Sequence, residues 1–121
     1  MEREDMKTND EVKPTVQRPW GYYTVLHERE GYKVKEIGVN PHSSLAMQKH
    51  QYRSEHWNVV EGTIKIIVGG KEAIVKKNES IFVPIDTKHK VYNETDLIAK
   101  IIEVQIGSYV GEDDITRYEK Y

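Results

Sequence analysis

The 121-residue sequence contains no cysteine, which excludes disulfide bonds, thiolate metal sites and cysteine nucleophiles. It has no run near the ~20 apolar residues of a membrane-spanning helix, and its first residues lack the apolar core of a secretion signal. The formal net charge is only −2, without a basic stripe or an arginine-rich tract. We therefore expect a cytoplasmic protein with no membrane and no nucleic-acid partner.

The length is typical of one domain with a single hydrophobic core. Residues 1–16 are rich in charged residues and have no sustained apolar period, which predicts a flexible charged arm. Residues 17–121 would then form the single folded domain.

Short segments with strand-like alternation follow one another along this domain, with turn residues between them. Eight to ten such strands at near-regular spacing predict an all-β sandwich or closed barrel. Acidic residues at 112–114, followed by Arg117 and Lys120 at helical spacing, predict a short C-terminal helical turn. The expected strands cover residues 22–26, 32–39, 45–50, 55–60, 63–68, 71–76, 80–84, 90–93 and 97–106.

A metal site is predicted by four residues at compatible spacing. Gln48 and His50 alternate on one expected strand, so both side chains can point at the same ion. Glu55 would lie on the next strand, and His89 on a more distant one that closes the site. An amide oxygen, two imidazoles and a carboxylate suit zinc, manganese, iron or nickel, and these ligand types alone do not choose among them.

Taken singly, each histidine is more often a hydrogen-bonded core or surface residue than a ligand. Their combined spacing favours a role as metal ligands only for His50 and His89, together with Gln48 and Glu55. His27 and His42 lie in or beside expected turns, and we expect both to be solvated. His56 adjoins Glu55, so strict alternation points it away from the ion.

These motifs resemble a known superfamily. The stretch Gln48–Gly62, with Pro84 and His89–Asn93, is similar to the two sequence motifs of the cupins. Over about residues 17–121 the chain resembles, within the cupins, the type II mannose-6-phosphate isomerase family, commonly the C-terminal domain of bifunctional mannose-1-phosphate guanylyltransferases. The segments that carry this resemblance are Arg18–Gly21, Gln48–His50, Arg53, Glu55–Trp57, Val59–Thr63, Glu103–Gln105 and Glu112–Ile115.

The resemblance implies a cupin double-stranded β-helix, a jelly-roll-like barrel, with zinc as the first choice of metal. Gln48 replaces the first histidine of the usual cupin motif, which favours the isomerase over the iron oxygenases that other cupins support. His42 and Asp86 stand at turn positions where the family usually has glycine. No glycine-rich nucleotide loop is present, so guanylyltransferase activity is not expected of this chain.

The implied activity interconverts mannose 6-phosphate and fructose 6-phosphate, in the metabolism of activated mannose and polysaccharide precursors. This reaction moves a proton between neighbouring carbons, while a metal can stabilise the developing oxyanion. The base is either a metal-bound water or one of Lys35, Lys65 and Glu103, if their strands turn them inward.

The substrate phosphate needs cations, and arginine offers a planar fork suited to phosphate oxygens. Arg53 is the first candidate because it lies between two expected ligands, and Arg18 and Arg117 follow because each lies in a family-like segment. The alternative for all three is a solvated charge or a structural ion pair.

A different class of function remains open from the sequence. The domain could be a non-catalytic module that binds a sugar phosphate or nucleotide sugar and acts with a separately encoded guanylyltransferase. In either role we expect a homodimer, because small cupins often pair through sheet edges.

Overall fold

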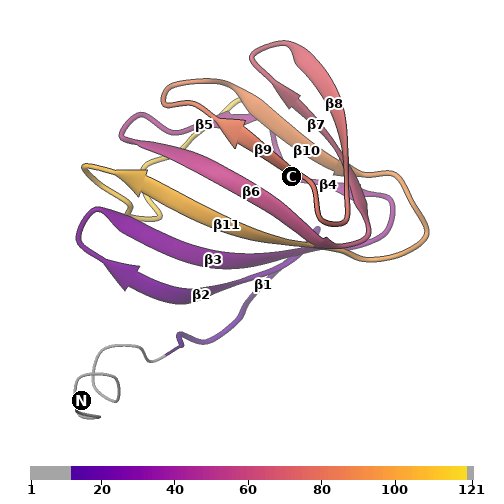
Figure 1. Ribbon diagram of the computed structural model, residues 1–121, viewed down its shortest axis with the longest axis horizontal. Coiled ribbons are helices and arrows are strands. Elements are labelled where there is room, and N and C mark those ends of the chain that lie inside the picture. The colour runs from indigo at the N-terminus through magenta and orange to yellow at the C-terminus, as the bar shows by residue number, and fades with distance from the viewer. Residues whose placement is uncertain (1–11, 120–121) are drawn as a thin grey trace.

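The computed structural model describes residues 12–119, which form two antiparallel β-sheets around a common interior (Figure 1). These residues contain no helix, and hence none that is long and apolar enough to cross a membrane. The first sheet has the order β1-β2-β3-β11-β6-β9, and the second β12-β5-β10-β7-β8, with β4 also paired to β10. The all-β prediction is confirmed.

The first sheet consists of β1 (Val16–Arg18), β2 (Gly21–Arg29), β3 (Tyr32–Val39), β11 (Ala99–Gly107), β6 (Arg53–Glu61) and β9 (Ser80–Val83). The second consists of β12 (Thr116–Arg117), β5 (Gln48–Lys49), β10 (His89–Asn93), β7 (Thr63–Val68) and β8 (Lys71–Lys76), and β4 is Ser43–Ser44. Most strands lie where the alternation predicted them. The strand expected over residues 45–50 shortens to β5, and β2 extends to Arg29, so the turn expected at 27–31 is confined to residues 30–31.

The strand register divides the barrel interior into an apolar and a polar half. On the inward face of β11, Ile101 lies between Ile37 of β3 and Val59 of β6, and Ala99 pairs with Val39. Together with Ile64, Ile66 and Val91 of the second sheet, these side chains belong to the hydrophobic core.

The next two inward positions of β11 are polar. Glu103 pairs with Lys35 of β3 and Trp57 of β6, and Gln105 pairs with Lys33 and Glu55. Since a strand turns every second residue to the same face, these pairings place a charged patch inside the barrel beside the apolar core.

The predicted C-terminal helical turn is not found in the described residues. The segment after β11 runs through turns and ends in β12, which pairs with β5. Its acids act on other parts of the chain: the Asp114 carboxylate accepts hydrogen bonds from the backbone N–H groups of Gln51 and Tyr52, both at 2.9 Å. These acids therefore do not begin a helix.

Most of the expected N-terminal arm lies outside the described residues, and its extent stays a prediction. Its last residues lie along β2, where the backbone N–H of Lys13 donates to the carbonyl of Val25 at 3.2 Å. The hydroxyls of Thr15 and Thr24 are 2.7 Å apart.

Both residues that replace family glycines adopt the backbone conformation that glycine favours. His42 has φ 55° and Asp86 has φ 56°, each in the left-handed region. The backbone at these two positions therefore keeps a conformation typical of glycine, although both residues carry a side chain.

Candidate metal centre

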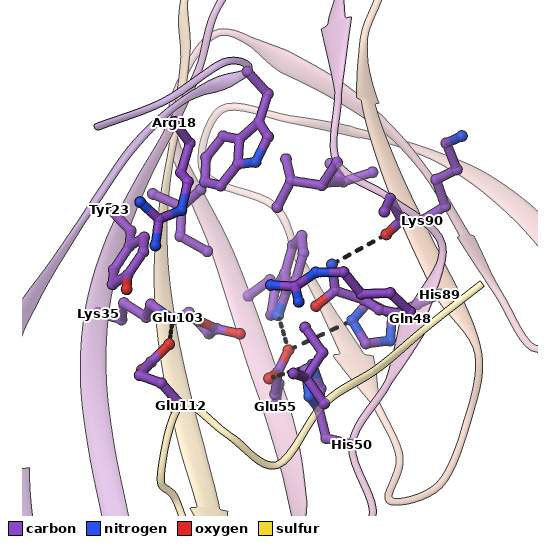
Figure 2. A pocket seen from close by; sticks show the side chains of 18 of the residues that line it. Arg18, Tyr23, Lys35, Gln48, His50, Glu55, His89, Lys90, Glu103 and Glu112 are labelled. Atoms are coloured by element: carbon purple, nitrogen blue, oxygen red, sulfur yellow. Dashed lines mark hydrogen bonds and ion pairs between the residues drawn. The ribbon is translucent and has the colours of Figure 1, made fainter. Parts of the chain in front are cut away.

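Three of the four predicted ligands meet inside the barrel. Potential ligand atoms of His50, Glu55 and His89 all lie within 4.8 Å of one another, and all three side chains are buried. Glu55 lies on β6 of the first sheet, whereas His89 begins β10 of the second and His50 directly follows β5. Figure 2 shows the three side chains converging from these elements.

Hydrogen bonds hold both imidazole rings in the form a metal needs. His50 Nδ1 donates to the Asp114 carbonyl at 2.8 Å, and His89 Nδ1 donates to the Thr87 carbonyl at 3.2 Å. The proton of each neutral ring therefore sits on Nδ1, and Nε2 is left unprotonated. At His50 this Nε2 accepts a contact of 3.3 Å from the Arg53 guanidinium. Both Nε2 atoms face Glu55, at 3.3 Å for His50 and 3.9 Å for His89. A hydrogen bond from Nδ1 to a backbone carbonyl is typical of histidines that bind a metal through Nε2.

The rings are also kept neutral. Burial lowers the pKa of His50 to about 4, with a further contribution from the charge of Arg53. Burial likewise lowers the pKa of His89. Neutral imidazole is the form that binds a metal ion.

Gln48, the fourth predicted ligand, lies on the strand that pairs with β10. Gln48 lies opposite His89 in the β5–β10 ladder and lines the same cavity. Its Nε2 donates to the Ala46 carbonyl at 3.0 Å, which assigns the amide nitrogen and leaves the amide oxygen for a ligand role.

Glu55 is fixed by two donors from its own strand. Arg53 Nε donates to Oε2 at 2.8 Å, and Trp57 Nε1 donates to Oε1 at 2.9 Å. Each carboxylate oxygen retains a second lone pair. The two unprotonated Nε2 atoms, this carboxylate and the Gln48 amide oxygen form a nitrogen and oxygen ligand set that fits a divalent transition metal.

The cluster opens on a cavity of about 140 Å³. Two of the three predicted proton-transfer candidates, Lys35 and Glu103, line this cavity. Lys65 does not line it. On β7 the inward positions are Ile64 and Ile66, so Lys65 faces the other side, where its ammonium group lies 2.9 Å from a Glu94 oxygen.

Glu103 is fully buried beside the cluster. Burial, together with the nearby charge of Glu55, raises the pKa of its carboxyl group to about 8 against the opposing effect of Lys35 and Arg53. The amide of Gln105 donates to Glu103 Oε1 at 3.2 Å.

The three predicted phosphate-binding arginines all line the cavity. Arg53 is buried and committed to Glu55, with a second contact from its guanidinium to His50 Nε2 at 3.3 Å. Arg18 on β1 and Arg117 on β12 are exposed at the cavity's edge, and the Arg18 guanidinium lies 5.6 Å from the centre of the Tyr23 ring.

Three residues near the site were missed as functional residues from the sequence. Lys33 and Glu112 form an ion pair of 2.6 Å inside the barrel, and Asp114 supports His50. The alternation of Lys33 and Lys35 with Ile37 and Val39 was the available signal, because buried lysines require an acidic partner.

Comparison with known proteins fits this geometry. Residues 4–120 match the family model described as "Mannose-6-phosphate isomerase C-terminal". The chain belongs to this family. It is 43% identical over 107 residues to a mannose-1-phosphate guanylyltransferase of Salmonella montevideo, and 41% identical over 104 residues to the xanthan biosynthesis protein XanB of Xanthomonas campestris.

These two alignments cover 88% and 86% of the chain but only 23% and 22% of the relatives. The chain thus spans less than a quarter of the length of the proteins it matches. Their names therefore describe much longer proteins.

Solved structures confirm the cupin fold. The Schizosaccharomyces pombe Cnp3 cupin domain aligns with a TM-score of 0.69 and 11% identity, covering 71% of this chain and 64% of that one. A Klebsiella pneumoniae protein with a double-stranded β-helix domain aligns with a TM-score of 0.70 and 17% identity, covering 88% and 85%. The predicted double-stranded β-helix is confirmed.

Proposed function

We propose that this cupin is a metal-dependent mannose-6-phosphate isomerase that interconverts mannose 6-phosphate and fructose 6-phosphate. The observation that carries the proposal is the buried set of His50, Glu55 and His89, with Nε2 unprotonated in both histidines, at the wall of a cavity lined by cations. Membership of the family and 43% identity to a mannose-1-phosphate guanylyltransferase support the link to mannose phosphates.

Gln48, His50, Glu55 and His89 would hold the ion, with zinc as the first choice. A divalent ion there would act as a Lewis acid that stabilises negative charge on the substrate oxygen. Arg53 orients the Glu55 carboxylate through its 2.8 Å bond, and Trp57 fixes the other oxygen.

Glu103 is our choice for the proton-transfer residue. It lines the cavity and is held by the amide of Gln105, whereas Lys35 forms an ion pair with Glu112. A carboxyl group in this position can take a proton from one carbon and return it to the next without leaving the cavity. Lys65 is not part of the proposal, because it lies on the outer face of β7.

The cavity is suited to a polar, anionic ligand. Its lining carries two more cationic side chains than carboxylates: Arg18, Lys35, Arg53, Lys90 and Arg117 against Glu55, Glu103 and Glu112. Trp20 also lines it, and its buried Nε1 has no hydrogen-bond partner among residues 12–119. This N–H is a free donor for a sugar hydroxyl, because a buried unpaired donor gains by meeting a ligand.

The direct test is turnover by the full chain. The protein is loaded with zinc, manganese, iron or nickel in turn, supplied with mannose 6-phosphate, and the formation of fructose 6-phosphate is followed. We expect turnover that chelation abolishes, and a loss of at least about a hundredfold in kcat/KM for Glu103→Gln. Retention of full activity after chelation would contradict the proposal.

One specific observation favours a second candidate. The Salmonella montevideo relative is named for guanylyl transfer, and the aligned region covers only 23% of it. The chain could therefore be a non-catalytic module that binds a sugar phosphate or nucleotide sugar beside a separate guanylyltransferase. Tight binding of mannose 6-phosphate without turnover, in protein with full metal content, would favour this module.

We further infer a homodimer. The outer face of the first sheet exposes Tyr32, Ile106 and Phe82, and Tyr32 and Ile106 are directly paired across β3 and β11. Burial of such a face against a second copy would remove apolar surface from water. Sedimentation at micromolar concentration distinguishes a dimer from a monomer.

A further inference from the structure

Two lysines project from β3 into the interior of the barrel. Lys33 and Lys35 occupy the inward face that continues as Ile37 and Val39, and only 1% of Lys33 and 7% of Lys35 is exposed. An ammonium group at such depth is costly unless an anion compensates its charge. The pair therefore marks a place where the fold requires an anion.

One carboxylate holds both ammonium groups. Glu112 Oε2 lies 2.6 Å from Lys33 Nζ, and Glu112 Oε1 lies 2.8 Å from Lys35 Nζ. Figure 2 shows the Glu112 carboxylate reaching up to Lys35 from the C-terminal segment. One negative charge thus faces two positive charges. A phosphate group can reproduce this arrangement, because it can also present two oxygens of one anion to the two lysines.

Glu112 is the accessible member of the trio. Its side chain is 42% exposed, against 2% for Lys33 and 9% for Lys35. It lies in the segment between β11 and β12, whose backbone is fixed by Asp114 on one side and by the contact of Arg53 with the Gly111 carbonyl on the other. Rotation of the Glu112 side chain alone can therefore carry its carboxylate into solvent while the lysines stay in place.

The site borders the candidate metal centre. Lys35 and Glu112 line the same cavity as His50, Glu55 and His89. The cavity volume of about 140 Å³ is smaller than the ~300 Å³ of the smallest usual small-molecule pockets. Outward rotation of Glu112 would enlarge the cavity and expose two cations at once.

We propose that Lys33 and Lys35 form the binding site for the phosphate group of a phosphate monoester, and that the Glu112 carboxylate occupies this site in the ligand-free protein. Lys35 then contacts substrate as a phosphate ligand and is not the proton-transfer base. Arg18 is placed to assist, because its guanidinium and the Lys35 ammonium lie 5.6 Å and 4.2 Å from the centre of the same Tyr23 ring. The identity of the sugar rests on the proposed function, but phosphate binding does not.

The test is a calorimetric titration of the full chain with inorganic phosphate and with mannose 6-phosphate, using mannose as the uncharged control. Glu112→Gln removes the internal competitor, and we expect it to raise phosphate affinity about tenfold. Asp113→Asn is the matched control, since it removes the same charge from the same turn, where Asp113 contacts Tyr109. Lys33→Met and Lys35→Met keep the apolar stems, and each should lower phosphate affinity at least about tenfold.

Melting curves and elemental analysis check that each variant is folded and keeps its metal content. Two results would overturn the inference. One is a Glu112→Gln protein that melts earlier but binds phosphate no better than Asp113→Asn, which would make the trio a structural link only. The other is phosphate binding that does not involve the lysines. It would show as affinity undetectable at millimolar phosphate in both the wild type and Glu112→Gln, or as affinity unchanged in folded Lys35→Met.

The outcome is separable from that of the proposed isomerase. Lysine-dependent phosphate binding without turnover would support the anion site and count against the activity. Turnover with phosphate affinity independent of both lysines would support the activity and overturn the anion site.

Discussion

His50 Nδ1 donates a 2.8 Å hydrogen bond to the backbone carbonyl of Asp114, which lies 64 residues further along the chain. The Asp114 carboxylate in turn accepts the N–H groups of Gln51 and Tyr52, directly after His50. The C-terminal segment therefore closes around the expected ligand at three points. It sets both the tautomer of the ring and the path of the backbone that carries it.

Loss of the Asp114 carboxylate should therefore weaken metal binding without removing a ligand. For Asp114→Ala we expect a fall in metal affinity of about tenfold or more, as is common when a partner that orients a ligand is lost. Competition with a chromogenic chelator measures it. Asp113→Ala is the control, because Asp113 contacts Tyr109 and not the His50 region. Equal affinity in both variants would mean that Asp114 does not position His50.

A second, sharper test compares His89, an expected ligand, with His56, the sequence neighbour of Glu55. His89 lies inside the barrel with its Nε2 3.9 Å from Glu55 Oε1. His56 lies on the outer face, where its ring centroid is 4.7 Å from that of Phe82. His89→Ala should lower metal affinity at least about a hundredfold, while His56→Ala should leave it unchanged. Elemental analysis of both purified proteins measures the effect. A similar loss of metal in the two would place the ion elsewhere.

The sequence predicted the positions of most strands because alternation of apolar and polar residues is a local property. Ile37, Val39, Ile101 and the polar pair at 103 and 105 lie as period-two spacing requires. Spacing on the expected strands also predicted that His50, Glu55 and His89 lie together, and the family resemblance supported this prediction. The exclusion of Lys65 needed the structure, because a one-residue difference in facing decides whether a strand residue enters the barrel.

The C-terminal segment shows why other features could not be predicted. Acids at the start of a segment are typical of a helix N-terminus, and Glu112 and Asp114 fit that local pattern. Their partners are Lys33, Lys35 and backbone groups at 51 and 52, more than 60 residues away in the sequence. Tertiary ion pairs and hydrogen bonds of this kind override a weak local preference.

The glycine replacements make a prediction about stability. His42 has φ 55°, where a residue with a Cβ is strained by about 1 kcal/mol relative to glycine, and its ion pair with Asp96 is exposed and contributes little. Replacing His42 by glycine would relieve this strain, but glycine loses more conformational freedom on folding, which offsets part of the gain in stability. We therefore expect His42→Gly to raise the free energy of unfolding by about 0.5 kcal/mol, measured by denaturant titration. His42→Ala keeps the Cβ and should give no gain, and an equal gain would rule out backbone strain as the cause.

The Glu112 ion pairs predict a defined dependence of stability on pH. Burial alone would raise the pKa of this carboxyl group, but the charges of Lys35 and Lys33 and their hydrogen bonds outweigh burial and lower the pKa from 4.5 to about 2. A carboxyl group with a depressed pKa in the folded state stabilises the protein above its unfolded pKa. That contribution is lost as the pH falls through the folded value. The relevant window therefore runs from about pH 4.5 down to about pH 2.

Denaturant unfolding of the wild type and Glu112→Gln at several pH values tests this dependence. Because the carboxylate is partly exposed, solvent screening limits the contribution, and we expect the wild type to be more stable by about 1 kcal/mol above pH 5. The difference should shrink through the window and vanish near its lower end, since both side chains are then uncharged. Asp113→Asn controls for the general loss of one negative charge. A difference between wild type and Glu112→Gln that stays constant from pH 6 to pH 2 would show that the ion pairs with Lys33 and Lys35 do not stabilise the fold.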